Sequence, residues 1–90
     1  MNNKIFNDLY IIAEIGTNHN GKIKDAIKLI NIAKKSGCNA VKFQSWDETM
    51  WSKNFLKKNP SLIKDIQRLF VSYSFLKRVR NYCKKIKIDF

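Results

Sequence analysis

The 90-residue sequence contains two cysteines, one proline, three glycines and one histidine, and only seven acidic residues against 18 basic ones. Cys38 and Cys83 stand in no metal-binding spacing and too far apart to staple a small fold, so we expect free thiols. No apolar run reaches the roughly 18 residues of a membrane span, and residues 1–8 lack the apolar segment of a signal peptide. The sequence therefore predicts a cytoplasmic protein that binds no membrane.

The formal net charge of +11 is the strongest signal in the composition. Such a charge can indicate a small basic module that binds nucleic acid or another anion, and this class stays open as an alternative. The basic residues, however, are scattered along predicted helices, and Lys, Ile and Asn are jointly abundant, as in the product of an A/T-rich coding sequence. We therefore expect solvated helix faces and no nucleic-acid partner.

The first half of the chain has the pattern of a strand, a helix and a second strand. Residues 9–15 form an apolar run before Gly16, which predicts a strand buried on both faces. After Gly21, apolar residues recur at spacings of three and four, which predicts an amphipathic helix closed by Gly37. A second apolar run, residues 40–44, follows. Such a crossover joins parallel strands, so the predicted fold class is α/β.

The second half of the chain is less regular. Residues 45–60 mix aromatic and charged side chains, which favours a packed or functional excursion over disorder. Ser72 is expected to cap a last helix, and residues 86–90 to begin a third strand. Between the excursion and Ser72 we expect a short helix with four apolar residues on one side: Leu62, Ile66, Leu69 and Phe70. Three strands are too few to close a barrel, which indicates a truncated chain.

Polar side chains stand near the ends of both predicted strands. Glu14 stands near the end of the first run, where an ionised carboxylate is costly unless it lies at the strand's mouth. Lys42 and Gln44 point to the same side of the second strand, because side chains alternate. The carboxyl ends of neighbouring parallel strands share one edge of a sheet, so we predict that these three side chains open into one pocket.

Three motifs closely resemble the start of the N-acetylneuraminate (sialic acid) synthase family. They are the sequence IIAEIGTNHNG at residues 11–21, a helix closed by Gly37, and AVKFQ at residues 40–44. A weaker similarity continues through Tyr82-Cys83 and residues 88–90. The resemblance implies a TIM (β/α)8 barrel followed by a small antifreeze-like domain. Residues 1–90 would then be a partial barrel, with the first two βα units and the start of a third strand.

The same resemblance implies an activity. Members of the family condense phosphoenolpyruvate with an N-acetylated aminosugar into a nine-carbon 2-keto acid, assisted by a divalent metal (Mn or Mg), and full-length members are homodimers. The resemblance therefore implies an enzyme of sialic acid biosynthesis, with the aminosugar left open. The family's metal ligands lie beyond this chain, so no metal site is assigned. The 90 residues alone are expected to be inactive, and a non-functional gene remnant remains an alternative.

The motif residues carry over one by one. Glu14 matches a glutamate that contacts the open-chain sugar near its reacting carbonyl and is a candidate for proton transfer. Lys42 matches a lysine that holds the carboxylate or phosphate of phosphoenolpyruvate, and Gln44 matches a residue that binds the sugar. Asn18 and His19 match the turn motif, where they either order the loop or touch substrate.

Other positions affect the backbone conformation and the helix ends. Gly16 and Gly21 are expected to adopt positive φ angles. Lys22 stands where the family commonly has an acidic residue that can cap the helix, so this helix should begin less favourably. Ser72 begins a cap, yet Phe75 stands where a Glu would complete a capping box.

Overall fold

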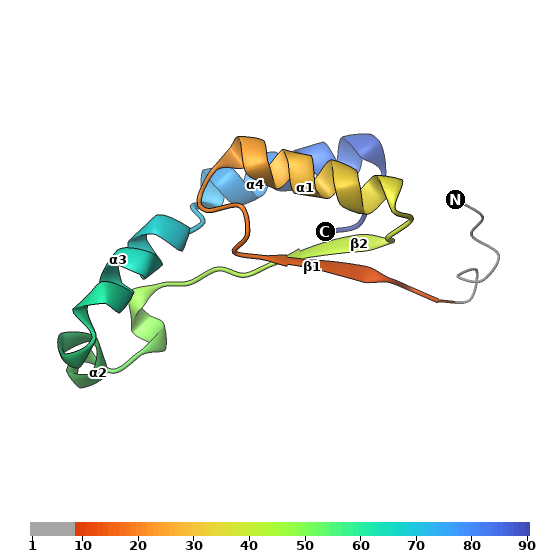
Figure 1. Ribbon diagram of the computed structural model, residues 1–90. Coiled ribbons are helices and arrows are strands. Elements are labelled where there is room, and N and C mark those ends of the chain that lie inside the picture. Colours follow the sequence, from red (N-terminus) through yellow and green to blue (C-terminus); the bar gives the residue numbers. More distant parts are fainter. Residues whose placement is uncertain (1–8) are drawn as a thin grey trace.

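The computed structural model describes residues 9–90 (Figure 1). Two parallel strands, β1 (Ile12–Gly16) and β2 (Ala40–Phe43), are joined by the helix α1 (Ile23–Lys35), which confirms the predicted strand-helix-strand unit. The remaining elements are the 3-10 turn η2 (Glu48–Met50) and the helices α2 (Lys53–Lys58), α3 (Pro60–Leu69) and α4 (Tyr73–Ile86). Within this part of the chain, no helix is both long and apolar enough to cross a membrane.

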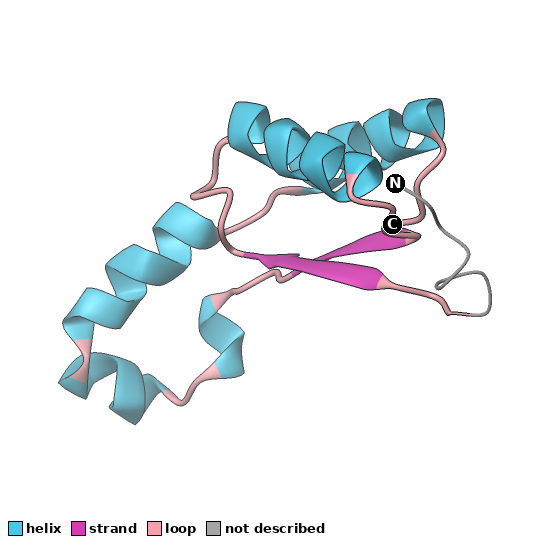
Figure 2. Ribbon diagram, turned by 45° about the vertical axis from the view of Figure 1, so that its right-hand side comes forward, coloured by secondary structure: helices cyan, strands magenta, loops and turns pink. Residues whose placement is uncertain are grey.

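The helices α1 and α4 lie side by side over one face of the strands, as both views show (Figures 1 and 2). Ile15 and Val41 point from the sheet into this layer, where they meet Ile30 of α1 and Val79 and Cys83 of α4. Each of these five side chains is at most 5% exposed. The apolar side predicted for α1 and one side of α4 therefore form the core together with the sheet.

The prediction that the first strand is buried on both faces is wrong. Ile12 is 53% exposed, and the side chain of Glu14 is 48% exposed. Side chains alternate along a strand, so Ile12 and Glu14 point away from the layer that buries Ile15. Among the residues described, α1 and α4 cover only one face (Figure 1), and the other face meets solvent.

The third strand predicted at residues 86–90 is reduced to one isolated bridge at Asp89, because α4 continues through Ile86. Ala40 pairs in parallel with Asp89, whose carbonyl accepts from the N–H of Val41 at 2.9 Å. The strand β2 thus lies between β1 and residue 89. The hydroxyl of Tyr10, just before β1, donates to the Asp89 carboxylate, and this bond raises the pKa of the Tyr10 hydroxyl. The phenol ring therefore links the two outer segments of the sheet.

The helix ends follow the sequence signals. Lys22 precedes α1 and makes no side-chain capping bond, as expected for a lysine at this position. Gly37, just beyond the last turn of the helix, has a φ of 89°. At the start of α4, Ser72 Oγ accepts the N–H of Phe75 at 3.1 Å. This bond confirms Ser72 as the helix cap.

The excursion between β2 and α4 holds structure of its own. Trp46 and Trp51 pack edge to face, with ring centroids 5.7 Å apart, around η2. Together, α2 and α3 extend beyond the carboxyl edge of the sheet (Figure 2), which makes the molecule elongated at 51 × 24 × 16 Å. On α3, Ile66 and Leu69 are buried as expected, whereas Phe70 is 51% exposed. Phe70 is exposed because α3 ends at Leu69 and the backbone of Phe70 itself is extended.

Candidate active site

Glu14 and Lys42 are partners in the parallel register of β1 and β2. Their side chains lie on the uncovered face, with Lys42 Nζ 3.7 Å from Glu14 Oε2. The side chain of Lys42 is 66% exposed and that of Glu14 is 48% exposed. The ammonium therefore has a counter-charge in reach and stays open to a ligand.

Gly16 brings a third side chain to this pair. A methyl group at Gly16, which has a φ of 59°, would lie 3.4 Å from Glu14 Oε1 and 3.7 Å from Gln44 Cδ. The N–H of Gln44 donates to the carbonyl of Gly16 at 3.2 Å, which fixes the end of β2 beside this glycine. The structure thus gathers Glu14, Lys42 and Gln44 at the carboxyl ends of two parallel strands.

The turn after β1 is ordered by its own polar groups. Asn18 donates twice to the carbonyl of Ile15, from its backbone N–H at 3.1 Å and from Nδ2 at 2.8 Å. Asn20 and Gly21 both have positive φ, of 54° and 76°. With Gly16, Gly21 confirms the predicted glycine conformations. Asn18 is exposed, and its contact with substrate stays a prediction.

His19 is fully buried beneath this turn. Its Nδ1 accepts the N–H of Gly21 at 2.9 Å, and its ring centroid lies 5.6 Å from that of Phe43 and 5.0 Å from that of Phe75. Burial lowers the pKa of the imidazole, which is therefore neutral with its proton on Nε2. This geometry orders the loop. A direct contact of His19 with substrate stays a prediction.

Sequence reasoning missed Arg68, near the end of α3. Its Nη1 donates to Asn20 Oδ1 at 2.9 Å, and its carbonyl oxygen would lie 2.4 Å from a methyl group at Gly21. The excursion is thereby docked on the turn after β1. The contact joins positions 48 residues apart, and the only local signal at Arg68 is an i,i+3 pair with Asp65.

Metal-ligating side chains are scattered. Residues 9–90 contain no group of three or more His, Cys, Asp or Glu side chains that could hold a metal ion. Both cysteines are free thiols, as predicted, with Cys38 partly exposed and Cys83 buried. The gathered groups are thus an ammonium, a carboxylate and an amide, a set suited to binding an anion beside a hydroxylated molecule.

Several known proteins are similar to this chain. An N-acetylneuraminate-9-phosphate synthase of Drosophila melanogaster is 54% identical over 44 residues, which are 49% of this chain and 12% of that protein. An N,N'-diacetyllegionaminic acid synthase of Campylobacter jejuni is 37% identical over 90 residues, covering 89% of this chain and 27% of that protein. The spore coat polysaccharide biosynthesis protein SpsE of Bacillus subtilis is 30% identical over 91% of this chain and 24% of its own length.

The chain is homologous to the N-terminal part of the sialic-acid-type synthases. This homology confirms the resemblance predicted from residues 11–21 and 40–44. No protein-family model matches the chain. The chain spans between 12% and 27% of the length of the three relatives described above. The two synthases among them are named for different acids.

Proposed function

We propose that residues 1–90 form the N-terminal part of a (β/α)8-barrel domain that condenses phosphoenolpyruvate with an N-acetylated aminosugar to a nine-carbon 2-keto acid. The pairing of Glu14 with Lys42, with Gln44 beside them, carries this proposal. Barrel enzymes bind their substrates at the carboxyl ends of the strands, where these three groups lie. The chain supplies one share of the substrate site and is inactive alone.

Lys42 binds the carboxylate or phosphate of phosphoenolpyruvate. Its ammonium is a compact charge on a flexible stem, and its 66% exposure leaves it open to an anion. Glu14, at 3.7 Å, attracts the ammonium toward the first strand without enclosing it. The enolpyruvate is thereby held on the uncovered face of the sheet, next to the carboxylate.

Glu14 and Gln44 orient the aminosugar. A carboxylate accepts hydrogen bonds from sugar hydroxyls, and an amide both donates and accepts. The reaction joins C3 of phosphoenolpyruvate to the aldehyde carbon of the sugar, after which water adds at C2 and phosphate leaves. In this scheme the aldehyde oxygen gains a proton as it becomes a hydroxyl, the water that adds at C2 loses one, and the Glu14 carboxylate assists this transfer.

The divalent metal implied by the family resemblance is not assigned to this part of the chain. The side chains of residues 9–90 do not fit such an ion, since none cluster in the way a metal site requires. We therefore assign only anion binding, sugar orientation and proton transfer to this chain.

A chimera tests the proposal. Residues 1–90 replace the matching segment of the Campylobacter jejuni N,N'-diacetyllegionaminic acid synthase, and formation of keto acid is measured. We expect an active chimera in which Lys42→Met raises the KM for phosphoenolpyruvate about 10- to 100-fold, the cost of losing one charged hydrogen bond. Glu14→Gln should mainly lower kcat, because it removes a proton carrier and keeps the shape.

Lys77→Met, on the exposed side of α4, is the matched control and should leave both constants unchanged. An active chimera whose Lys42→Met and Glu14→Gln variants behave like this control would refute the assigned roles. A second measurement concerns the chain itself. The purified 90-residue protein, mixed with phosphoenolpyruvate, N-acetylmannosamine and Mn²⁺, should form no nine-carbon keto acid, and any turnover would contradict the partial-site assignment.

A further inference from the structure

His19 lies where three parts of the fold meet. Its ring centroid is 5.6 Å from that of Phe43, the last residue of β2, and 5.0 Å from that of Phe75, in the first turn of α4. Its Nδ1 accepts the N–H of Gly21, which fixes the ring to the turn after β1. The imidazole is 0% exposed, so it joins this turn to the end of β2 and to the start of α4.

The pairing of β1 with β2 is irregular at the candidate active site. Glu14 is the register partner of Lys42. The next pair is Gly16 with Phe43, so β1 has one extra residue at this place. Such a bulge changes the direction of neighbouring side chains and is frequent beside active sites. Lys42 and Gln44 flank Phe43 and point to the opposite side of β2, so the position of Phe43 decides where both polar side chains lie.

An imidazole is a costly side chain for this buried space. Its Nε2 is buried and has no hydrogen-bond acceptor among residues 9–90. A buried donor without a partner costs free energy, and an apolar side chain of similar size would avoid this cost. An apolar side chain, however, could not accept the N–H of Gly21. Because His19 combines that acceptor with a flat ring against Phe43, it couples the conformation of the turn to the end of β2.

We propose that His19 is a positioning residue of the candidate active site, a role that presupposes the function proposed above. The neutral imidazole keeps Phe43 opposite Gly16. Phe43 in turn keeps its neighbours Lys42 and Gln44 in place on the uncovered face of the sheet, where phosphoenolpyruvate binds. His19 thus acts through Phe43, from the face of the sheet that the helices cover.

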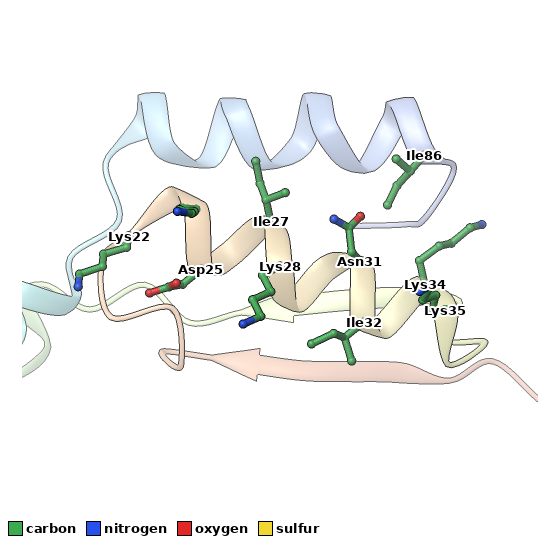
Figure 3. A pocket seen from close by; sticks show the side chains of 10 residues that line it. Lys22, Asp25, Ile27, Lys28, Asn31, Ile32, Lys34, Lys35 and Ile86 are labelled. Carbon is green, nitrogen blue, oxygen red and sulfur yellow. The ribbon is translucent and has the colours of Figure 1, made fainter.

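The groups in contact with the imidazole carry no charge. They are the rings of Phe43 and Phe75 and the backbone N–H of Gly21, and burial alone lowers the pKa of His19. Lys28 of α1 stands on the outward side of that helix (Figure 3). Titratable and charged side chains of the surrounding elements are all exposed: Glu14 and Lys42 of the strands, Lys22 and Arg68 beside the turn, and Tyr73, Lys77 and Arg78 of α4. Protonation removes Nδ1 as an acceptor, so acidic pH should release the turn.

Amide hydrogen exchange of the 90-residue protein tests this coupling without reference to activity. The N–H of Gln44 is bonded to Gly16, and the N–H of Val41, bonded to Asp89, is the internal reference on the same strand. The ratio of the exchange rate at Gln44 to that at Val41 should rise about tenfold as the pH falls from about 7.5 to about 5.5. In His19→Gln, which lacks the ring, the ratio should be raised at both pH values and independent of pH.

A ratio that does not change with pH in the wild type would overturn the proposal. So would a loss of protection at both amides together, since His19 would then stabilise the whole fold without a particular effect on the end of β2.

Kinetics test the effect on substrate binding. In the chimera with the Campylobacter jejuni synthase, His19→Gln and Phe43→Leu should each raise the KM for phosphoenolpyruvate about five- to tenfold. The double variant should be no worse than either single variant, because both changes remove the same contact. Circular dichroism must show that each variant is folded. Less active enzyme with an unchanged KM would mean that His19 has a structural role alone, which overturns the proposal.

Failure of the proposed function gives a different result. The chimera would then be inactive, or Lys42→Met would leave its KM for phosphoenolpyruvate unchanged. In that case the exchange ratio of Gln44 to Val41 decides by itself whether His19 controls the end of β2.

Discussion

His19 Nδ1 accepts the backbone N–H of Gly21 at 2.9 Å, inside a turn that leaves the imidazole no exposure. Burial lowers its pKa below the ordinary value of 6.5, so the unfolded chain binds the proton more readily than the folded one. The stability contributed by this group is complete above the unfolded pKa and is lost as the pH falls toward the folded pKa. We expect the urea midpoint to decrease as the pH is lowered from 7.5 to 5.

His19 is the only histidine of the chain, so this pH window isolates it from other side chains. His19→Gln removes the titration and keeps a side chain that can accept from the Gly21 N–H. The variant should show a flatter dependence of its urea midpoint on pH over the same range. Identical slopes for the two proteins would mean that the imidazole does not control the turn.

Gly21 is the position of the turn that least tolerates a side chain. It combines a φ of 76° with a carbonyl oxygen of Arg68 only 2.4 Å from the place of a Cβ. We expect Gly21→Ala to lower the free energy of unfolding by at least about 2 kcal/mol, from backbone strain and from displacement of α3. Gly16→Ala, where the nearest atom is the flexible Glu14 carboxylate at 3.4 Å, should cost only the strain, about 1–2 kcal/mol. Denaturant unfolding of the two variants measures the difference, and equal losses would contradict the close contact.

Substitutions at Ile30 and Ile32 test how α1 packs on the sheet. Ile30 is 0% exposed and Ile32 is 52% exposed, although both belong to α1. Ile30→Val should cost about 1 kcal/mol and Ile30→Ala about 2–5 kcal/mol, whereas Ile32→Ala should change the stability by less than about 0.5 kcal/mol. Thermal melts compare the series. A larger loss of stability at Ile32 than at Ile30 would mean that α1 turns a different face toward the sheet.

The two thiols should differ in reactivity. Cys83 is 1% exposed and burial raises its pKa to about 11, whereas Cys38 is partly exposed. At pH 8 about one Cys83 in a thousand is ionised, and alkylation requires the thiolate. Iodoacetamide should therefore label Cys38 first in the native protein and both residues in guanidinium, as mass spectrometry of peptides can show. Equal native labelling would indicate that α4 does not pack on the sheet.

Local signals in the sequence predicted much of this fold. The spacing of apolar residues and Gly37 predicted α1, and Ser72 predicted the start of α4, because these features depend on neighbouring residues. The parallel pairing followed from the length of the crossover. Because the carboxyl ends of parallel strands share one edge of a sheet, Glu14, Lys42 and Gln44 could also be placed together.

Contacts between distant positions could not be predicted in this way. Arg68 bonds to Asn20 across 48 residues, and Tyr10 bonds to Asp89 across 79, without any motif that links the partners. The burial of His19 also depends on Phe75, which belongs to α4. The sequence left open whether His19 orders the loop or touches substrate, and its burial is a result of tertiary packing.

The outer edge of β1 affects how copies of this protein associate. Within residues 9–90, β1 has a single neighbour, β2, so its outer edge offers free backbone groups beside the exposed Ile12. Such an edge is a template for aggregation between molecules. The net charge of +11 opposes that step by electrostatic repulsion. We therefore expect colloidal solubility to depend on ionic strength, with added salt or polyanions promoting association of the molecules.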